Sequence, residues 1–537
     1  MKRINRRSFL RCTGVAAATV ALRSQGVAWA EGAPLAATTA GKVRGAIEDG
    51  VNVFKGIPYG ADTAKTRFKA PLTPAPWKDV KECTRFAPMA PQLPQPAAVG
   101  STHAARGEGG QSEDCLHLNV WTGGLRDNRK RPVLVYFHGG AYNNGTVNSD
   151  LYDGKRLVHC GDVVVVTVNH RLNGFGYLYL GDLAPEYAES GNAGQLDLIL
   201  ALKWVRDNIA EFGGDAGRVL IFGQSGGGAK CAALMATPAA KGLFHRVMSM
   251  SGQQIKGASI EIAAGRARTV LEKMGVTPGK NLAQQLNALT MEQIQAGAAA
   301  VSQDWLPVVD QITLPRNPFD PDAPALSAMV PMILGNTHDE TNVAGREAIS
   351  WENAAAVLKG TVSQYLGPYT PEQVVAKYRE IYPSYSAEQV ATAAATAFRA
   401  WPGQRWEAER RAANPVSQAH TWVYQMNFPG GNGKAMHTID IPFMFDNIDF
   451  AEAQVGKEPE HLAQAHALAV TMSEVLITYA RTGNPNHAGL AEWPAYDLKN
   501  RSTMIWEKAP HIERDPRGAE RVFADGAHYH QAGTPLP

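Results

Sequence analysis

The residues best suited to chemistry surround Ser225, at the centre of the segment 223–227, Gly-Gln-Ser-Gly-Gly. The apolar run 218–222, which reads as a strand, precedes this segment, and the helix-forming run 229–235 follows it. A serine at a sharp turn between a strand and a helix has an exposed hydroxyl, and the helix N-terminus favours negative charge beside it. The spacing therefore predicts Ser225 as the nucleophile of an acyl transfer.

A serine hydroxyl is a weak nucleophile and needs a base that is oriented by an acid. In the strand–turn–helix arrangement, the acid comes later in the chain than the serine, just past the end of another strand. The predicted strand 331–334 is followed by Asp339 and Glu340. Position alone makes these two carboxylates equal candidates for the acid.

The base is expected to be a histidine that follows the acid in the chain. The predicted strand 421–424 leads through a glycine-rich loop to His437, which therefore has the required position. His420 and His487 lie in the same part of the chain and remain alternatives.

The tetrahedral intermediate of acyl transfer carries an oxyanion, which backbone N–H groups can stabilise. The segment 138–141, His-Gly-Gly-Ala, follows the predicted strand 133–137 and is the loop expected to supply such donors. The N–H of Gly226, directly after the nucleophile, is expected to join them. We expect His138 to shape this loop rather than to transfer protons.

Short apolar runs rich in β-branched residues alternate with helical patterns along the chain. One clear helix is expected from about 193 to 212, ending at the glycine pair 213–214. This alternation predicts an α/β fold whose largely parallel sheet carries helices on both faces. The Ala-rich stretches 257–300 and 341–415 are interpreted as helical excursions from one domain. The predicted strands are 132–137, 163–168, 218–222, 247–250, 331–334 and 421–424.

The N-terminal segment 1–30 has the pattern of a twin-arginine export signal. It contains a twin arginine, a mild apolar stretch over 12–22 and a small-x-small site at 28–30. The apolar stretch is shorter than the roughly 20 residues that span a bilayer. We therefore expect a mature domain over 31–537, periplasmic or secreted, without a stable membrane anchor.

Charge excludes one class of partner. The segment 1–30 carries six basic and no acidic residues, so the remainder has 46 basic against 50 acidic side chains. A net negative chain does not favour nucleic acid as a partner. The expected partner is a small-molecule ester, and the oligomeric state stays open.

No cysteine pair has the Cys-x-x-Cys spacing of a zinc or thioredoxin-like site. Cys83 and Cys115 are candidates for a disulfide in an oxidising compartment. Glu113, Asp114, Arg171 and Asp215 are interpreted as structural ion pairs rather than as chemistry. No metal or organic cofactor is expected.

Several further motifs, in order along nearly the whole mature chain, resemble those of the type B carboxylesterase/lipase family, which includes the cholinesterases. The resemblance implies an α/β-hydrolase fold, with helical insertions that form a gorge, and serine carboxylesterase activity. The motifs are 54–60 (FKGIPYG), 112–120 (SEDCLHLNV), 191–197 (GNAGQLD), 212–215 (FGGD) and 437–443 (HTIDIPF).

The resemblance also implies roles for individual residues. The family's acid is the second residue of the Asp-Glu pair, which implies Glu340. Its histidine opens the His-x-x-Asp/Glu-Ile-Pro-Phe segment, which implies His437. Its oxyanion donors match Gly140, Ala141 and Gly226.

Ser251 matches a hydroxyl that supports the acid in relatives. The chain departs from the family at Gln224, where relatives carry a glutamate, and at Gly226, where they carry an alanine. The usual partner of the signature cysteine would fall near Ala90, which puts a Cys83–Cys115 disulfide in doubt. Residues 87–120 contain no Phe, Tyr or Trp, which argues against choline esters.

Two other functions remain alternatives. An amide or carbamate hydrolase would use the same three residues. A non-catalytic binding protein of the same fold would be expected to have lost some of them.

Overall fold

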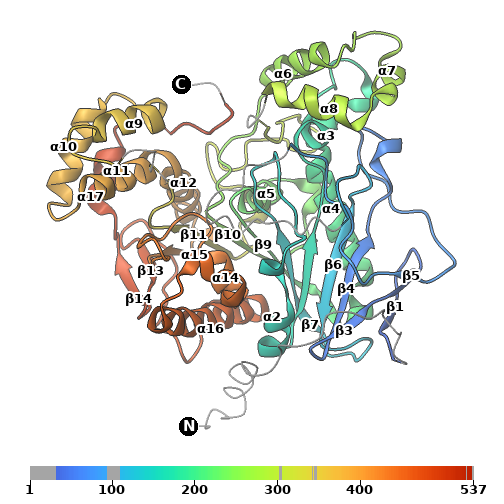
Figure 1. Cartoon of the computed structure of the whole chain (residues 1–537), viewed down its shortest axis with the longest axis horizontal. Coiled ribbons are helices and arrows are strands. Elements are labelled where there is room, and N and C mark those ends of the chain that lie inside the picture. The colour runs from blue at the N-terminus through green and yellow to red at the C-terminus, as the bar shows by residue number, and fades with distance from the viewer. Residues whose placement is uncertain are drawn as a thin grey trace.

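A mixed sheet runs through the computed structural model, which describes residues 32–93, 109–301, 305–341, 343, 348–527 and 529–534. Figure 1 shows this sheet between two helical layers. The segment 1–30, and with it the expected export signal, lies outside the described residues. In spatial order the strands are β14 (His511–Arg514), β13 (Ser502–Trp506), β12 (Thr421–Met426), β11 (Met332–Thr337), β10 (Arg246–Met250), β9 (Gly214–Gln224), β7 (Arg131–Phe137), β8 (Val164–Val168), β6 (His117–Thr122), β4 (Val51–Pro58) and β3 (Ala46–Glu48).

The seven central strands, β8, β7, β9, β10, β11, β12 and β13, run parallel to one another, and antiparallel strands close both edges. All six predicted strands are present, so the predicted parallel core of the sheet is confirmed. A small second sheet is formed by β1 (Leu35–Ala37), β2 (Lys42–Arg44) and β5 (Lys81–Glu82).

The predicted helix 193–212 is α4 (Ala193–Asn208), followed by a 3₁₀ turn over Ile209–Phe212. It ends where Gly213 adopts φ 71°, a left-handed conformation that glycine accepts without strain. The other helices are α2 (Lys155–Gly161), α3 (Asn173–Tyr177), α5 (Gly226–Met235), α6 (Ile260–Lys273), α7 (Leu282–Ala288), α8 (Met291–Ala298), α9 (Ala354–Val362), α10 (Pro371–Ile381), α11 (Ala387–Ala395), α12 (Trp401–Ala412), α13 (Pro415–Gln418), α14 (Asp440–Met444), α15 (Glu452–Val455), α16 (Pro459–Thr482) and α17 (Gly518–Ala524).

Alternate residues of the central strands belong to two different cores. Val133 and Val135 of β7 pack in the core that includes α4, whereas Leu134 and Tyr136 pack in the core that includes α16. Successive strand side chains point to opposite faces, so every residue of β7 is buried. This explains why the central strands read as continuous apolar runs.

The two helical insertions expected from the sequence form separate groups at one end of the strands. Figure 1 shows α6, α7 and α8 together at the upper right and α9, α10 and α11 with α17 at the upper left. Each group has its own apolar core. Within the described residues, no helix is both long and apolar enough to cross a membrane.

The expected structural ion pairs are largely confirmed. Arg67 pairs with Glu113 at 2.5 Å and Arg218 with Asp215 at 2.8 Å. Asp114 makes no ion pair with any described residue. Arg171 and Asp197 form a completely buried pair, joined by hydrogen bonds of 2.6 and 2.9 Å. Breaking such a pair leaves an uncompensated buried charge.

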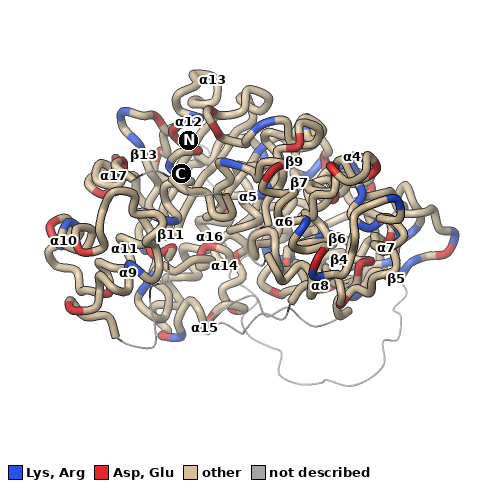
Figure 2. The backbone as a smooth tube through the Cα atoms, turned by 90° about the horizontal axis from the view of Figure 1, so that it is seen from above, with Lys and Arg blue, Asp and Glu red and all other residues tan. Residues whose placement is uncertain are grey.

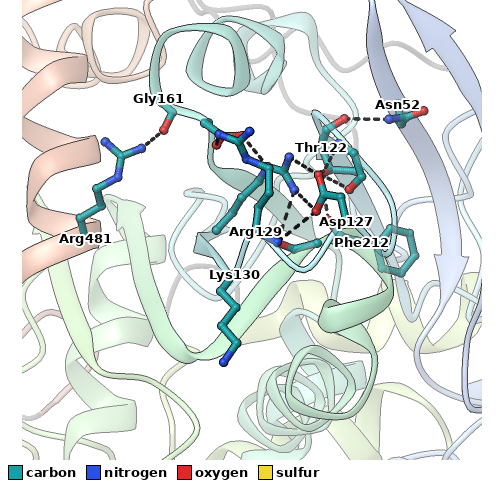
Figure 3. Close-up of polar contacts among 12 residues, drawn as sticks. Asn52, Thr122, Asp127, Arg129, Lys130, Gly161, Phe212 and Arg481 are labelled. Atoms are coloured by element: carbon teal, nitrogen blue, oxygen red, sulfur yellow. Dashed lines mark hydrogen bonds and ion pairs between the residues drawn. The ribbon is translucent and has the colours of Figure 1, made fainter.

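A second polar cluster lies where β7 begins. Arg131, almost fully buried, forms ion pairs with Asp127 and Asp162. Figure 3 shows Asp127 beside Thr122, whose hydroxyl donates to the Phe212 carbonyl. These contacts fix the turn before β7, and we assign the cluster a structural role.

Figure 2 shows acidic and basic residues mixed along the chain rather than gathered by sign.

The candidate disulfide between Cys83 and Cys115 is not formed, since both residues are buried free thiols. The Cys83 sulfur lies 3.8 Å from the Gly56 carbonyl, whereas Cys115 lies near the Arg171–Asp197 pair. Burial raises the pKa of Cys83 to about 12 and that of Cys115 further still, so both stay protonated.

Candidate active site

Ser225 stands at a strained turn between β9 and α5, at one end of the sheet (Figure 1). Its backbone has φ 56° and ψ −126°, a conformation that is uncommon for residues other than glycine. Its N–H donates to the Met250 carbonyl at 2.7 Å, which ties the turn to β10. The turn projects the serine beyond the end of the strand.

The glycines around Ser225 are required by close backbone approaches. A Cβ at Gly227 would lie 2.0 Å from the Phe137 carbonyl oxygen, and one at Gly223 would lie 2.4 Å from the backbone of Gly227. A Cβ at Gly226 would lie 2.3 Å from the Ala141 carbonyl oxygen. Gly226 therefore leaves room for the loop that follows β7.

That loop, residues 138–141, lies directly against the turn. Gly140 and Ala141 both have positive φ, 88° and 50°. The Gly140 carbonyl accepts hydrogen bonds from the N–H groups of Asn143 and Asn144, both at 3.1 Å. With its carbonyl held in this way, the loop brings the backbone of Ala141 beside Gly226.

Glu340 and His437 meet beyond the ends of β11 and β12. One carboxylate oxygen of Glu340 contacts Nδ1 of His437 in a very short hydrogen bond. The other accepts from the Ser251 hydroxyl, from the Thr337 N–H at 2.8 Å and from the Asn336 amide at 3.2 Å. Ser251 therefore supports the carboxylate, as the resemblance implied.

The two groups shift each other's pKa. Burial raises the pKa of Glu340, but the charge of His437 and the donated hydrogen bonds outweigh burial and hold it below its usual value. Burial lowers the pKa of His437, but the charge and hydrogen bond of Glu340 outweigh it and hold it above 6.5. The pair thus favours a carboxylate beside a readily protonated imidazole.

The structure separates the residues that position alone left equal. Asp339 accepts from the Ala435 N–H at 2.9 Å and contacts the His338 ring at 3.0 Å, so it binds the loop before His437 rather than the imidazole. His420 lies at the start of β12, where its carbonyl accepts from Met332. His487 contacts the Gly489 N–H, and neither of these two histidines bonds to Glu340.

Gln224, directly before the nucleophile in the chain, contacts the histidine. Its buried amide nitrogen lies against the His437 ring, 3.3 Å from Nε2 and 3.5 Å from Nδ1. Ser225 Oγ has no hydrogen-bond partner among the described residues, so the link from serine to imidazole is open. Hydrogen bonds of this kind are often long before substrate binds.

Two buried ionisable groups near the site were missed by the sequence analysis. Asp440 accepts from the Tyr424 hydroxyl at 2.7 Å, and burial, together with the charge of Glu340, raises its pKa to about 7. Its position three residues after His437 was the available signal. Lys230 is completely buried on α5, and its signal was a lone charge in a helix of glycine, alanine and apolar residues.

A small cavity of about 30 Å³ is not this site. It lies beside α12, β12 and β13, and its lining includes neither Ser225 nor His437. Its arginines are neutralised by neighbouring carboxylates, as in the pairs of Arg521 with Asp515 and of Arg501 with Glu409. We interpret it as a polar structural pocket.

Comparison with known proteins covers most of the chain. Residues 32–523 match the model of the carboxylesterase family. A para-nitrobenzyl esterase of Bacillus subtilis is 33% identical over 503 residues, which cover 90% of this chain and 97% of the relative. A phenmedipham hydrolase of Pseudarthrobacter oxydans is 29% identical over 516 residues, with the same coverage of 90% and 97%.

Solved structures agree with this assignment. The crystal structure of a Geobacillus stearothermophilus carboxylesterase at pH 6.2 is 34% identical and superposes with a TM-score of 0.77. The match covers 91% of this chain and 99% of that one. The chain therefore belongs to the carboxylesterase family, has the α/β-hydrolase fold and is a carboxylic ester hydrolase.

Proposed function

We propose that the chain hydrolyses carboxylic esters in two steps through an acyl-enzyme on Ser225. Ser225 Oγ attacks the ester carbonyl while His437 takes its proton, and Glu340 orients the imidazole and stabilises its charged form. The proton then passes to the departing alcohol, and water releases the acid by the same route. The contact of His437 with Glu340, beyond the turn that carries Ser225, is the observation on which this proposal rests.

The oxyanion of each tetrahedral intermediate is assigned to the N–H groups of Gly140, Ala141 and Gly226. The close approach of Ala141 to Gly226 supports this assignment, because it brings the loop and the first turn of α5 to the same point. Donors fixed in advance cost no reorganisation when charge develops. The reaction as proposed uses these groups alone and requires no metal or organic cofactor.

Gln224 is assigned a role in holding the imidazole. Its amide nitrogen contacts both ring nitrogens of His437, and so limits how the ring can turn. A glutamine adds no charge beside the base. The charge on His437 therefore depends chiefly on Glu340, whose effect on the pKa of His437 exceeds that of Asp440.

We propose residues 1–30 as a twin-arginine export signal and residues 31–537 as the single catalytic domain. The twin arginine, the apolar stretch and the small-x-small site support export. The mature enzyme would then act in the periplasm or outside the cell, without a stable membrane anchor.

A labelling experiment tests the proposed mechanism. A fluorophosphonate is expected to modify one serine, and peptide mass spectrometry is expected to place the adduct on Ser225. Matched ester and amide substrates distinguish an esterase from an amide hydrolase. An esterase is expected to cleave the ester at least about 100-fold faster than the amide, which corresponds to a barrier lower by roughly 2.7 kcal/mol. An equal or faster rate on the amide would favour the amidase, and absence of any adduct would favour a binding protein.

Gly226→Ala is expected to lower kcat about 10- to 100-fold. The added Cβ would lie 2.3 Å from the Ala141 carbonyl oxygen and 2.4 Å from its Cα, so the loop has to move. Steady-state kinetics with a chromogenic ester measure the change. Gly360→Ala in α9 is the control, since its Cβ would meet nothing within 4 Å. An unchanged kcat in Gly226→Ala would contradict the assigned position of the loop.

A further inference from the structure

Lys230 is an unusual residue to find behind a catalytic serine. It lies on α5, just over one turn after Ser225, and its side chain is completely buried. Its ammonium donates to the carbonyl oxygens of Ala141 at 2.7 Å and His138 at 3.2 Å. It also lies 5.4 Å from the centre of the Tyr142 ring. All three partners belong to the segment that follows β7.

No carboxylate pairs with Lys230 in the described part of the chain. A buried ammonium without a counter-ion is costly, and burial lowers the pKa of Lys230 to about 7. Its charge also contributes, after burial itself, to lowering the pKa of the buried His170. Its hydrogen bonds to two loop carbonyls are what compensate for burial at this position.

The hydrogen bonds of residues 138–141 show which backbone groups Lys230 holds in place. The two carbonyls that it binds, those of His138 and Ala141, lie on either side of the peptide units that carry the N–H groups of Gly140 and Ala141. Between them, the Gly139 carbonyl contacts the His138 ring at 2.8 Å, and the Gly140 carbonyl accepts from the backbone after it. Every carbonyl of residues 138–141 is therefore bound within the protein.

We propose that Lys230 is a positioning residue of the oxyanion hole, whose ammonium holds the carbonyls of His138 and Ala141 so that the N–H groups between them point at the ester oxygen. This inference rests on the proposed function. Gly226 and Lys230 act from the same helix, since Gly226 leaves space for the Ala141 carbonyl and Lys230 binds it.

Lys230→Met keeps the length and apolar stem of the side chain and removes its donors and charge. The expected result is a kcat about 10- to 100-fold lower with KM changed by less than about 3-fold, because the misaligned donors are needed only once the oxyanion forms. Rates are expressed per active serine, titrated to completion with a fluorophosphonate. Cys231→Ala, at the buried neighbour of Lys230 on α5, is the matched control.

A pair of inhibitors separates positioning from mere stability. A trifluoromethyl ketone forms a bond from Ser225 Oγ to its carbonyl carbon, the proton passes to His437, and the carbonyl oxygen becomes the oxyanion. Its affinity is expected to fall in Lys230→Met by the same factor as kcat/KM. The affinity of the carboxylic acid product, which forms no such bond, is expected to change by less than about 3-fold. A structural role would lower the melting temperature and leave this difference unchanged.

Each outcome bears on one of the two claims. An unchanged ketone affinity in a folded Lys230→Met overturns the role of Lys230, provided that the wild type binds the ketone tightly. A wild type that forms no adduct overturns the proposed function instead. If Lys230→Met does not fold, Lys230→Gln and Lys230→Arg replace it. The arginine variant is then expected to exceed the glutamine variant in ketone affinity, and equal affinities overturn the proposal.

Discussion

Ser225→Ala is expected to abolish ester hydrolysis, with kcat lower by about a millionfold. The substitution removes the only atom that forms a bond to the acyl group and leaves the base, its carboxylate and the oxyanion donors in place. The fold is expected to persist, because alanine removes a single oxygen and Ser225 Oγ makes no hydrogen bond to any described residue. The measurement is the hydrolysis of a chromogenic ester at high enzyme concentration, with circular dichroism as the test of folding.

Ser473→Ala is the matched control for this variant. Ser473 is a buried serine of α16 whose hydroxyl donates to the Val470 carbonyl, so its loss tests the general effect of removing a buried hydroxyl. Its activity is expected to equal that of the wild type. A Ser225→Ala enzyme that retains a tenth of the wild-type rate, or that still reacts with a fluorophosphonate at the same site, would show that another residue is the nucleophile.

The sheet and the nucleophile turn were predictable because they depend on local patterns. Buried parallel strands must be apolar on both faces, so β7, β8 and β9 each contain a continuous run of apolar or β-branched residues. The turn at Ser225 needs glycines at fixed positions, because backbone atoms of Phe137 and Gly227 occupy the space of their side chains. Both signals lie within a few residues of the feature that they predict.

The acid was not predictable from position, because Asp339 and Glu340 follow the same strand. Neighbouring residues in extended backbone direct their side chains to opposite sides. Asp339 turns to the Ala435 N–H and Glu340 to the His437 ring, and only the folded loops decide which carboxylate meets the histidine. Here the family resemblance implied a choice that the spacing left open.

Lys230, Cys83 and Cys115 show a different limit of sequence-based prediction. Their surroundings depend on residues that are far away in the sequence. A lysine in a helix is usually exposed. Its burial here depends on carbonyls 89 and 92 residues away. Likewise, Cys83 and Cys115 suit a secreted protein by composition, but nothing in their spacing says that they lie in different surroundings. Chemistry that arises from packing has to be found in the structure.

Glu340→Gln is expected to lower kcat by about 10,000-fold while leaving KM within a few-fold. The amide keeps the size of the side chain but loses the charge, so it no longer stabilises the imidazolium of His437. The charge and hydrogen bond of Glu340 are what hold the pKa of His437 above 6.5 against burial, which lowers it. In the wild type the rate is expected to fall as the pH drops through the raised pKa of His437, because the protonated imidazole cannot act as the base. In Glu340→Gln the same fall is expected at lower pH, and kcat/KM measured from pH 4 to 9 records the shift.

Asp339→Asn is the control that makes this prediction specific. The two carboxylates are adjacent, both are largely shielded from water, and the pKa of each is held below its usual value. The carboxylate of Asp339, however, binds the Ala435 N–H, and an asparagine oxygen can still accept that hydrogen bond. Asp339→Asn is therefore expected to keep kcat within about 10-fold of the wild-type value. The pH at which kcat/KM falls on acidification is expected to stay unchanged. The reverse pattern, with Asp339→Asn inactive and Glu340→Gln active, would mean that the histidine takes its acid from Asp339 in the working enzyme.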